Sequence, residues 1–332
     1  MEKDWIEALD GLRGVAAYSV VISHYAGQTI LQPLHLVGQV GVMLFFVISG
    51  FLMGDLYMRT PFTRGNLQAF YIKRFARVVP LYYLVVLASV TLFMARQSVW
   101  PAYSIDALWH YLLFWRGENV LWTIPVEVQF YALFPVIWWL FSRAGPASML
   151  LILVFCAIEA AWIDTPVLFQ SFLPYFAAGL LLSIVQIPYS RLIEFMILPA
   201  AIVLTLALPD ISAAMGFRPT GLWESPVYLL TVPTTVLLVI KSRGANVLLG
   251  GRIGVFAGKI SYSVYLLHMP VHFVMRQLPI YETSPLLFIG LTLIVTTAVS
   301  WLSFTIIEKP ARNWINGTFA SGESGSARAV LA

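Results

Sequence analysis

Long runs of apolar residues, separated by short polar segments, dominate the chain. Each run is about 17–25 residues long, which is the length that an α-helix needs to cross the roughly 30 Å hydrocarbon core of a bilayer. The runs are continuous rather than alternating, so they indicate helices and not the strands of a membrane barrel. We predict an all-α polytopic membrane protein with about ten transmembrane helices, at residues 10–28, 37–57, 78–95, 120–141, 147–163, 168–186, 192–208, 222–240, 254–278 and 286–307.

Composition agrees with this prediction and indicates one domain followed by a tail. Hydrophobic residues make up 59% of the 332 residues and charged residues 11%, whereas a soluble domain has roughly 25% charged residues. The chain has one cysteine, Cys156, so no internal disulfide is possible. We predict one membrane-embedded domain over residues 1–315. The Gly- and Ser-rich residues 316–332 are expected to form a disordered cytoplasmic tail.

The distribution of basic residues predicts the orientation in the membrane. Ten spans place both termini on one side of the membrane. Of the 20 Lys and Arg residues, only four are predicted on the opposite side, namely Arg96, Arg116, Arg218 and Arg276. Basic residues in short loops mark the cytoplasmic side, so both termini are predicted to be cytoplasmic. Residues 64–77 combine basic and apolar positions, which favours an amphipathic helix on the inner membrane surface before the third span.

Two polar side chains of the first predicted span share one helix face. Arg13 and His24 are eleven residues apart, and at about 100° per residue this spacing is three turns plus roughly 20°, or about 16 Å along the axis. An arginine at a helix start can simply reach the lipid headgroups, and a histidine can simply bond a neighbouring helix. The shared face favours a third interpretation, a common polar path through the bundle.

A carboxylate in the fourth predicted span falls at a similar depth. Glu127 lies about 12 Å from the outer end of this span at 1.5 Å per residue. Because an unpaired carboxylate is costly inside a membrane, we predict that Glu127 pairs with His24. Such a pair would fix the tautomer of the imidazole and raise its basicity, as a general base requires. A hydrogen bond between helices without any chemistry is the alternative.

Further candidates lie in the ninth span and before the third. His268 is predicted near the depth of His24, with Tyr265 three residues earlier on the same helix face, and these side chains either line a cavity or pack between helices. Lys73, Arg74 and Arg77 are predicted at the cytoplasmic mouth. Arginine clusters bind phosphates, but they also contact anionic lipids.

Several common catalytic patterns are absent from the sequence. It has no HxH, CxxC or HExxH spacing for zinc, no GxSxG elbow and no P-loop, so no metal site is predicted. A basic cytoplasmic mouth and a buried His/Glu pair suit an enzyme that takes an anionic activated donor from inside the cell. They also suit a proton-coupled secondary transporter, and a structural scaffold for polysaccharide export is a third alternative.

Six blocks of sequence, in order, resemble the integral-membrane bacterial acyltransferases of acyltransferase family three. The blocks are LDGLRGVAAYSVVISHY, GVMLFFVISGFLMG, FYIKRFARVVPLYY, LWTIPVEVQFYALFP, ISYSVYLLHMPV and IIEKPARNW. Members of this family O-acylate cell-surface and secreted carbohydrates. The sequence departs from the family pattern at Val128, where a second glutamate is common, at Lys73, where an arginine is common, and at Leu267 and Met269, where tryptophans usually flank the histidine.

The resemblance implies an inner-membrane O-acyltransferase, similar to the short members that acetylate exopolysaccharide or its lipid-linked precursor. It implies acetyl-CoA, or another acyl-CoA, as donor substrate, and neither a permanently bound cofactor nor a nucleic-acid partner. Three groups of residues follow from it by position. The catalytic candidates are His24, Glu127 and Arg13. The residues expected to bind the phosphates of the donor are Arg74, Arg77 and Lys73. The candidates that line the substrate site are His268, Tyr265 and Trp122.

Overall fold

The computed structural model describes residues 4–25, 32–95, 108–152, 154, 170–185, 195, 223 and 226–319. Every regular element within these residues is a helix, and the described part of the chain contains no β-strand. This confirms the all-α prediction for those residues. The predicted span at 192–208 and most of the one at 147–163 lie outside the described residues.

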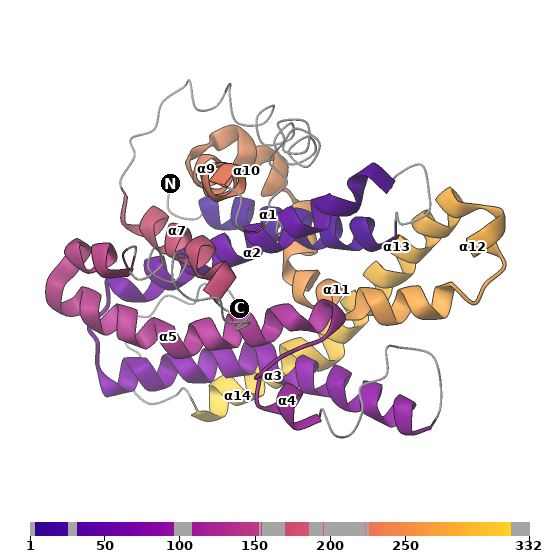
Figure 1. Cartoon of the computed structure of the whole chain (residues 1–332), viewed down its shortest axis with the longest axis horizontal. Coiled ribbons are helices and arrows are strands. Elements are labelled where there is room, and N and C mark those ends of the chain that lie inside the picture. Colours follow the sequence, from indigo (N-terminus) through magenta and orange to yellow (C-terminus); the bar gives the residue numbers. More distant parts are fainter. Residues whose placement is uncertain are drawn as a thin grey trace.

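Each of the other predicted spans coincides with described helices, which Figure 1 shows in chain order. The N-terminal half contains α1 (Asp4–Tyr25), η1 (Gln32–Leu36), α2 (Val37–Met53), η2 (Gly54–Met58), α3 (Arg64–Met94), α4 (Leu108–Leu112), η4 (Asn119–Trp122), α5 (Thr123–Ala144) and η5 (Gly145–Ala147). The C-terminal half contains η6 (Gln170–Phe172), α7 (Leu173–Ile184), α9 (Pro226–Lys241), α10 (Arg243–Leu249), α11 (Arg252–Met275), α12 (Ile280–Thr283), α13 (Pro285–Ser303), η8 (Phe304–Glu308) and α14 (Lys309–Phe319).

Length and composition identify fewer membrane spans than the ten predicted. Among the described residues, four helical stretches are long and apolar enough to cross a bilayer, namely Leu34–Met58, Arg64–Met94, Asn119–Ile152 and Pro285–Phe319. The bent pair α9 and α10, with an angle of 92° between its halves, is a fifth candidate. The structure therefore supports a polytopic helical membrane protein, whereas the number ten and the orientation of the termini stay predictions.

Helix α3 differs from the predicted arrangement of a surface helix followed by a span. It is one continuous helix of 31 residues, about 46 Å long at 1.5 Å per residue, which exceeds the roughly 30 Å of hydrocarbon. It begins at a cap in which Thr63 Oγ1 accepts a hydrogen bond from the backbone N–H of Asn66 at 3.2 Å. Arg74 and Arg77 thus lie on the same continuous helix as the apolar segment of the predicted third span.

The helices that carry the candidate residues pack directly on one another. Helix α1 packs most extensively against α11 and also against α2, and α2 packs against α7. Figure 1 shows α3 and α5 side by side, with α14 beside α3. Glycines permit the contact between α1 and α11, because a Cβ atom at Gly258 would lie 2.1 Å from the carbonyl oxygen of Asp10. This backbone contact turns the face of α1 that bears Arg13 and His24 towards α11.

Two π-helical segments, η2 and η8, interrupt otherwise α-helical stretches. Glu308, the last residue of η8, is only 4% exposed and accepts a hydrogen bond of 2.9 Å from Ser263 of α11. Beyond η8, α14 continues to Phe319, so helix extends past residue 315, where the predicted domain ends. Residues 320–332 of the predicted tail lie outside the described residues.

Candidate active site

One cavity lies between α1, α2, α3, α5 and α11. Its empty space, including the part that is open to the outside, is about 680 Å³. The described residues that line it are Arg13, Val42, Phe45, Phe46, Ile48, Ser49, Leu52, Met53, Arg74, Arg77, Thr123, Ile124, Glu127, Ser261, Tyr262 and Tyr265. Four residues predicted from the sequence to carry charge at the site, on three different helices, therefore face one space.

Arg13 is held in place by contacts on two helices. Its Nη1 donates a hydrogen bond to Asp10 Oδ1 at 3.2 Å, one turn earlier on α1. Its Nη2 donates to Ser261 Oγ of α11 at 3.3 Å. The side chain is 11% exposed, so Arg13 is a partly neutralised cation in the cavity wall and does not extend to lipid headgroups.

Glu127 is fixed by two hydroxyl groups. Ser49 of α2 donates a hydrogen bond to Glu127 Oε1 at 3.1 Å. Tyr131, one turn later on α5, donates to the same oxygen. These two bonds satisfy Oε1 of the carboxylate and orient the group in the cavity wall.

Arg74 lies between two aromatic rings. Its guanidinium carbon is 5.9 Å from the ring centre of Tyr57 and 5.8 Å from that of Tyr131. Such rings stabilise a cation through their negative faces. Its Nε is buried and has no hydrogen-bond partner among the residues that the structure describes. Arg77 also lines the cavity, whereas Lys73 does not.

The charged groups that line the cavity have a positive balance. The described lining residues contain three arginines and one carboxylate. Asp10 offsets part of the charge of Arg13, which leaves Arg74 and Arg77 facing Glu127. A partly desolvated crevice with this balance attracts anions, and guanidinium groups match phosphate oxygens in geometry.

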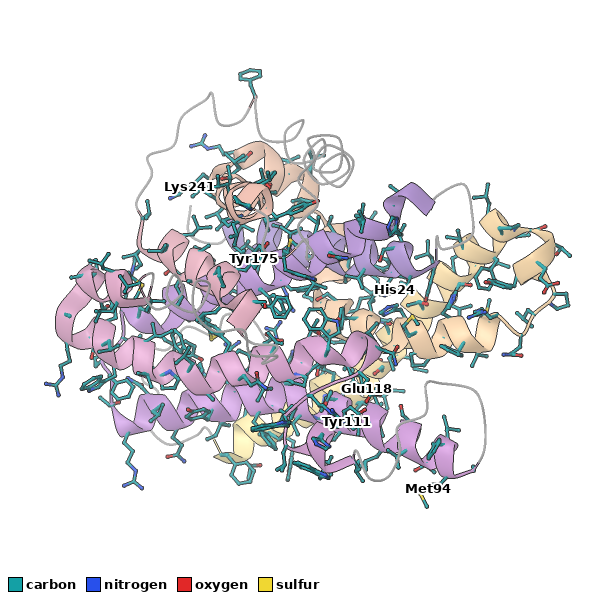
Figure 2. The ribbon with its side chains drawn as sticks, in the orientation of Figure 1. His24, Met94, Tyr111, Glu118, Tyr175 and Lys241 are labelled. Carbon is teal, nitrogen blue, oxygen red and sulfur yellow. The ribbon has the colours of Figure 1, made fainter. Side chains whose placement is uncertain are left out.

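His24 lies outside this group of charges. Figure 2 shows it near the end of α1, where its side chain is exposed. Its Nδ1 lies 3.1 Å from Nε2 of His268 on α11, and the two ring centres are 5.1 Å apart. The predicted hydrogen-bonded pair of His24 and Glu127 is therefore wrong in this structure. Similar depth does not bring two residues together, because side chains on different helices can face different neighbours. His24 bonds to α11, whereas Glu127 bonds to α2 and to its own helix.

The three candidate lining residues have different positions. Tyr265 lines the cavity, and its hydroxyl donates to the carbonyl oxygen of Val120 at 2.8 Å. His268 is fully buried and forms the pair with His24. Trp122 packs among aromatic rings instead, with its ring centre 4.8 Å from that of Phe172. It is not among the described residues that line the cavity.

Sequence reasoning missed the residues that hold the charged groups. Tyr131 could have been found, because it lies four residues after Glu127 and therefore on the same helix face. Ser261 and Asp10 gave no comparable signal, since serine is frequent between packed membrane helices and Asp10 lies at the edge of a predicted span. Buried Glu308, near the end of the last predicted span, was also missed.

Comparisons with known proteins assign the chain to a family. The O-acetyltransferase OatA of Staphylococcus aureus (strain NCTC 8325 / PS 47) is 24% identical over 366 residues, which cover 93% of the chain and 57% of the relative. OatA of strain COL matches with the same values. The chain thus spans just over half the length of these curated relatives, and no solved structure matches it. Residues 6–305 match the model of acyltransferase family three, which describes an acyltransferase domain. The resemblance seen in the sequence is confirmed, and the chain belongs to this family.

Proposed function

We propose that the chain is an integral-membrane O-acyltransferase that moves an acetyl group from acetyl-CoA to a hydroxyl group of a surface or secreted carbohydrate, or of its lipid-linked precursor. The observation that carries this proposal is that Arg13, Arg74, Arg77 and Glu127 line one and the same cavity. Family membership supports it, as does the name O-acetyltransferase of relatives that match most of the chain.

The arginines of α3 suit the phosphate groups of coenzyme A. Arg74 is desolvated and stacked between tyrosine rings, and its Nε has no protein acceptor among the described residues. An incoming phosphate would provide such an acceptor for Arg74 and a counter-charge for Arg77. Lys73 lies on the same helix beside them and would act from outside the cavity as a further positive charge.

The reaction needs a base for the acceptor and stabilisation of developing negative charge. In the proposed step, His24 takes the proton of the sugar hydroxyl while the oxygen attacks the thioester carbonyl. The C–O bond forms, the C–S bond breaks, and the coenzyme A thiolate then takes the proton from His24, which returns to its neutral state. Arg13, held by Asp10 and Ser261 about three helical turns from His24, would line the path of the donor and balance its negative charge.

Glu127 has a different role in this proposal from the one predicted from the sequence. It does not touch His24, so it would not set the basicity of that ring directly. It accepts hydrogen bonds from Ser49 and Tyr131, and Tyr131 is one of the rings beside Arg74. We infer that Glu127 balances the guanidinium charges and fixes the tyrosine that orients Arg74.

The proposed orientation places the donor on the cytoplasmic side of the bacterial inner membrane. The concentration of basic residues on the side of the termini supports this placement. Fusions of green fluorescent protein and of alkaline phosphatase after Phe319 test it. The fluorescent fusion should be bright and the phosphatase fusion inactive, and the reverse result would contradict a cytoplasmic C-terminus.

Thiol release tests the activity itself. Purified protein in lipid nanodiscs, incubated with acetyl-CoA and candidate glycans, should release free coenzyme A and yield an acetylated glycan in mass spectrometry. His24→Ala should abolish both, since a positioned base contributes about 10²–10⁴-fold in rate. Ser19→Ala is the matched control on α1, because Ser19 Oγ only donates to the carbonyl oxygen of Val15 in the same helix. Solute uptake by proteoliposomes without thiol release would favour the transporter alternative instead.

A further inference from the structure

The hydrogen bonds of His268 determine which of its ring nitrogens carries a proton. Its Nδ1 lies 2.7 Å from the carbonyl oxygen of Tyr265 and 3.2 Å from that of Val264. A carbonyl oxygen only accepts hydrogen bonds, so Nδ1 carries the hydrogen and donates. The ring is 0% exposed and bonds to no carboxylate among the described residues, and an unpaired buried cation is costly. His268 is therefore neutral, with a lone pair on Nε2.

This protonation state of His268 determines the tautomer of His24. The Nε2 atom of His268 lies 3.1 Å from Nδ1 of His24. Because Nε2 of His268 can only accept, Nδ1 of His24 carries the hydrogen and donates it. The opposite tautomer of His24 would place two lone pairs against each other. In neutral His24 the free lone pair is then on Nε2, the other side of an exposed ring.

Tyr25, the residue after His24 on α1, contacts the backbone of His268. The hydroxyl of Tyr25 donates to the carbonyl oxygen of His268 at 2.8 Å. It lies 2.7 Å from Thr296 Oγ1 of α13, from which it accepts, since its own hydrogen is used. Two consecutive residues of α1 thus contact His268, one at its ring and one at its backbone, and this arrangement limits rotation of the histidine pair.

We propose that His268 is a positioning residue that holds His24 in the Nδ1–H tautomer, so that Nε2 of His24 is the atom that accepts the proton of the acceptor hydroxyl. The inference rests on the proposed function, in which His24 is the base. From the sequence, Glu127 was predicted to orient His24. In this proposal the neutral imidazole of His268 has that role instead. His268 is joined to the cavity through Tyr265, whose carbonyl accepts from His268 and whose side chain lines the cavity.

Nitrogen-15 NMR of histidine-labelled protein in nanodiscs measures the tautomer directly. The chain has five histidines, and the signal of His24 is identified by its loss in His24→Asn. At about pH 8, where an ordinary histidine is neutral, His24 should show a protonated Nδ1 and an unprotonated Nε2. In His268→Leu this preference should be lost, whereas in His268→Gln it should be retained in part, because the amide oxygen of glutamine can accept from Nδ1.

A matched control separates this effect from general disturbance of α11. His272 lies one turn after His268, is 7% exposed and stacks on Tyr25 with ring centres 4.9 Å apart. His272→Phe keeps an aromatic ring there, so the tautomer of His24 and the rate of transfer should both stay as in the unmodified protein.

Kinetics give the second readout. His268→Leu should lower kcat at least tenfold, as a part of the roughly 10²–10⁴-fold that a positioned base supplies, while KM for acetyl-CoA changes little. His268→Gln should recover part of kcat. An Nε2–H tautomer of His24 in the unmodified protein would overturn the inference, even if His24→Ala is inactive. Full activity of His24→Ala would overturn the proposed function instead and leave the tautomer measurement standing. If His268→Leu does not fold, the spectrum of the unmodified protein and His268→Gln still decide.

Discussion

The Gly258→Ala substitution would place a methyl group at the contact between α1 and α11. The added carbon would lie 2.1 Å from the carbonyl oxygen of Asp10 and 2.4 Å from its carbonyl carbon. Ordinary contacts between such atoms are about 3.5 Å, so the two helices would have to separate locally by about 1 Å or more. The hydrogen bond between Arg13 and Ser261 lies one turn away and is already 3.3 Å long. A separation of this size would break it.

The expected cost has two parts. Overpacking of a close contact costs about 1–3 kcal/mol, and loss of a hydrogen bond to a charged group costs about 1.5–3 kcal/mol. Together the loss of stability is about 2.5–6 kcal/mol, which corresponds to a fall in Tm of at least about 5 °C by the relation for domains of about 150–250 residues. Transfer activity should fall about 10²-fold, because a 1 Å displacement of a catalytic group has effects of that order.

The assay compares two glycine substitutions in helices of the bundle. Gly290→Ala in α13 is the control, since no atom lies within 4 Å of its added carbon, and alanine is favoured over glycine in a helix by about 1 kcal/mol. Thermal unfolding in nanodiscs, followed by tryptophan fluorescence, should show a lower Tm for Gly258→Ala and an unchanged or higher Tm for Gly290→Ala. Equal Tm values, with full transfer activity in both variants, would refute the close contact of α1 and α11.

Three other substitutions test separate parts of the site. Arg74→Ala should raise the Kd for coenzyme A at least tenfold in calorimetry, and Arg74→Lys should not restore it, because lysine lacks the planar fork; unchanged donor affinity would assign Arg74 to a structural or lipid-binding role. Tyr131→Phe removes a donor to Glu127 and should lower kcat and donor affinity together, a result that would be contradicted by loss of thermal stability alone. Ser263→Ala leaves Glu308 without its 2.9 Å hydrogen bond and should lower stability by about 1.5–3 kcal/mol with KM for acetyl-CoA unchanged; a Tm equal to that of the unmodified protein would argue against this bond.

The sequence was sufficient to select the charged residues of the cavity. Arg13, Arg74, Arg77 and Glu127 stand out because a charge within an apolar run is costly in a membrane and must find a partner or a polar space. Helical periodicity placed each of them along its own helix. Tyr131, four residues after Glu127, lies on the same helix face and follows from the same periodicity.

The partner of His24 could not be derived in this way. Position along a sequence gives the depth of a residue in the membrane, but the direction of its side chain depends on which helices pack together. His24 and Glu127 have similar predicted depths, yet His24 contacts His268 because glycines such as Gly258 bring α11 against α1. Trp122 shows the same limit, since a tryptophan beside a site and a tryptophan in an aromatic cluster look alike in sequence.

The break predicted within residues 64–94 illustrates a different limit. Residues 64–77 are amphipathic and residues 78–95 are apolar, and this change of pattern suggested two elements. A change of pattern does not by itself bend a helix, and the internal Pro80 does not end α3. As a result, the basic residues and the apolar part belong to one continuous helix.

The π-helical segment η8 determines which face of the following helix, α14, is turned towards α3. A π-turn holds one residue more than an α-turn, and one residue corresponds to about 100° of rotation about the helix axis. With this extra residue, Ile315 of α14 is buried where α14 packs on α3, while Trp314 is exposed. Deleting a single residue between Phe304 and Glu308 would regularise the helix, yet swing Ile315 off α3. Insertions and deletions should therefore be far less tolerated here than conservative replacements, so the count of residues in this segment matters more than their identity.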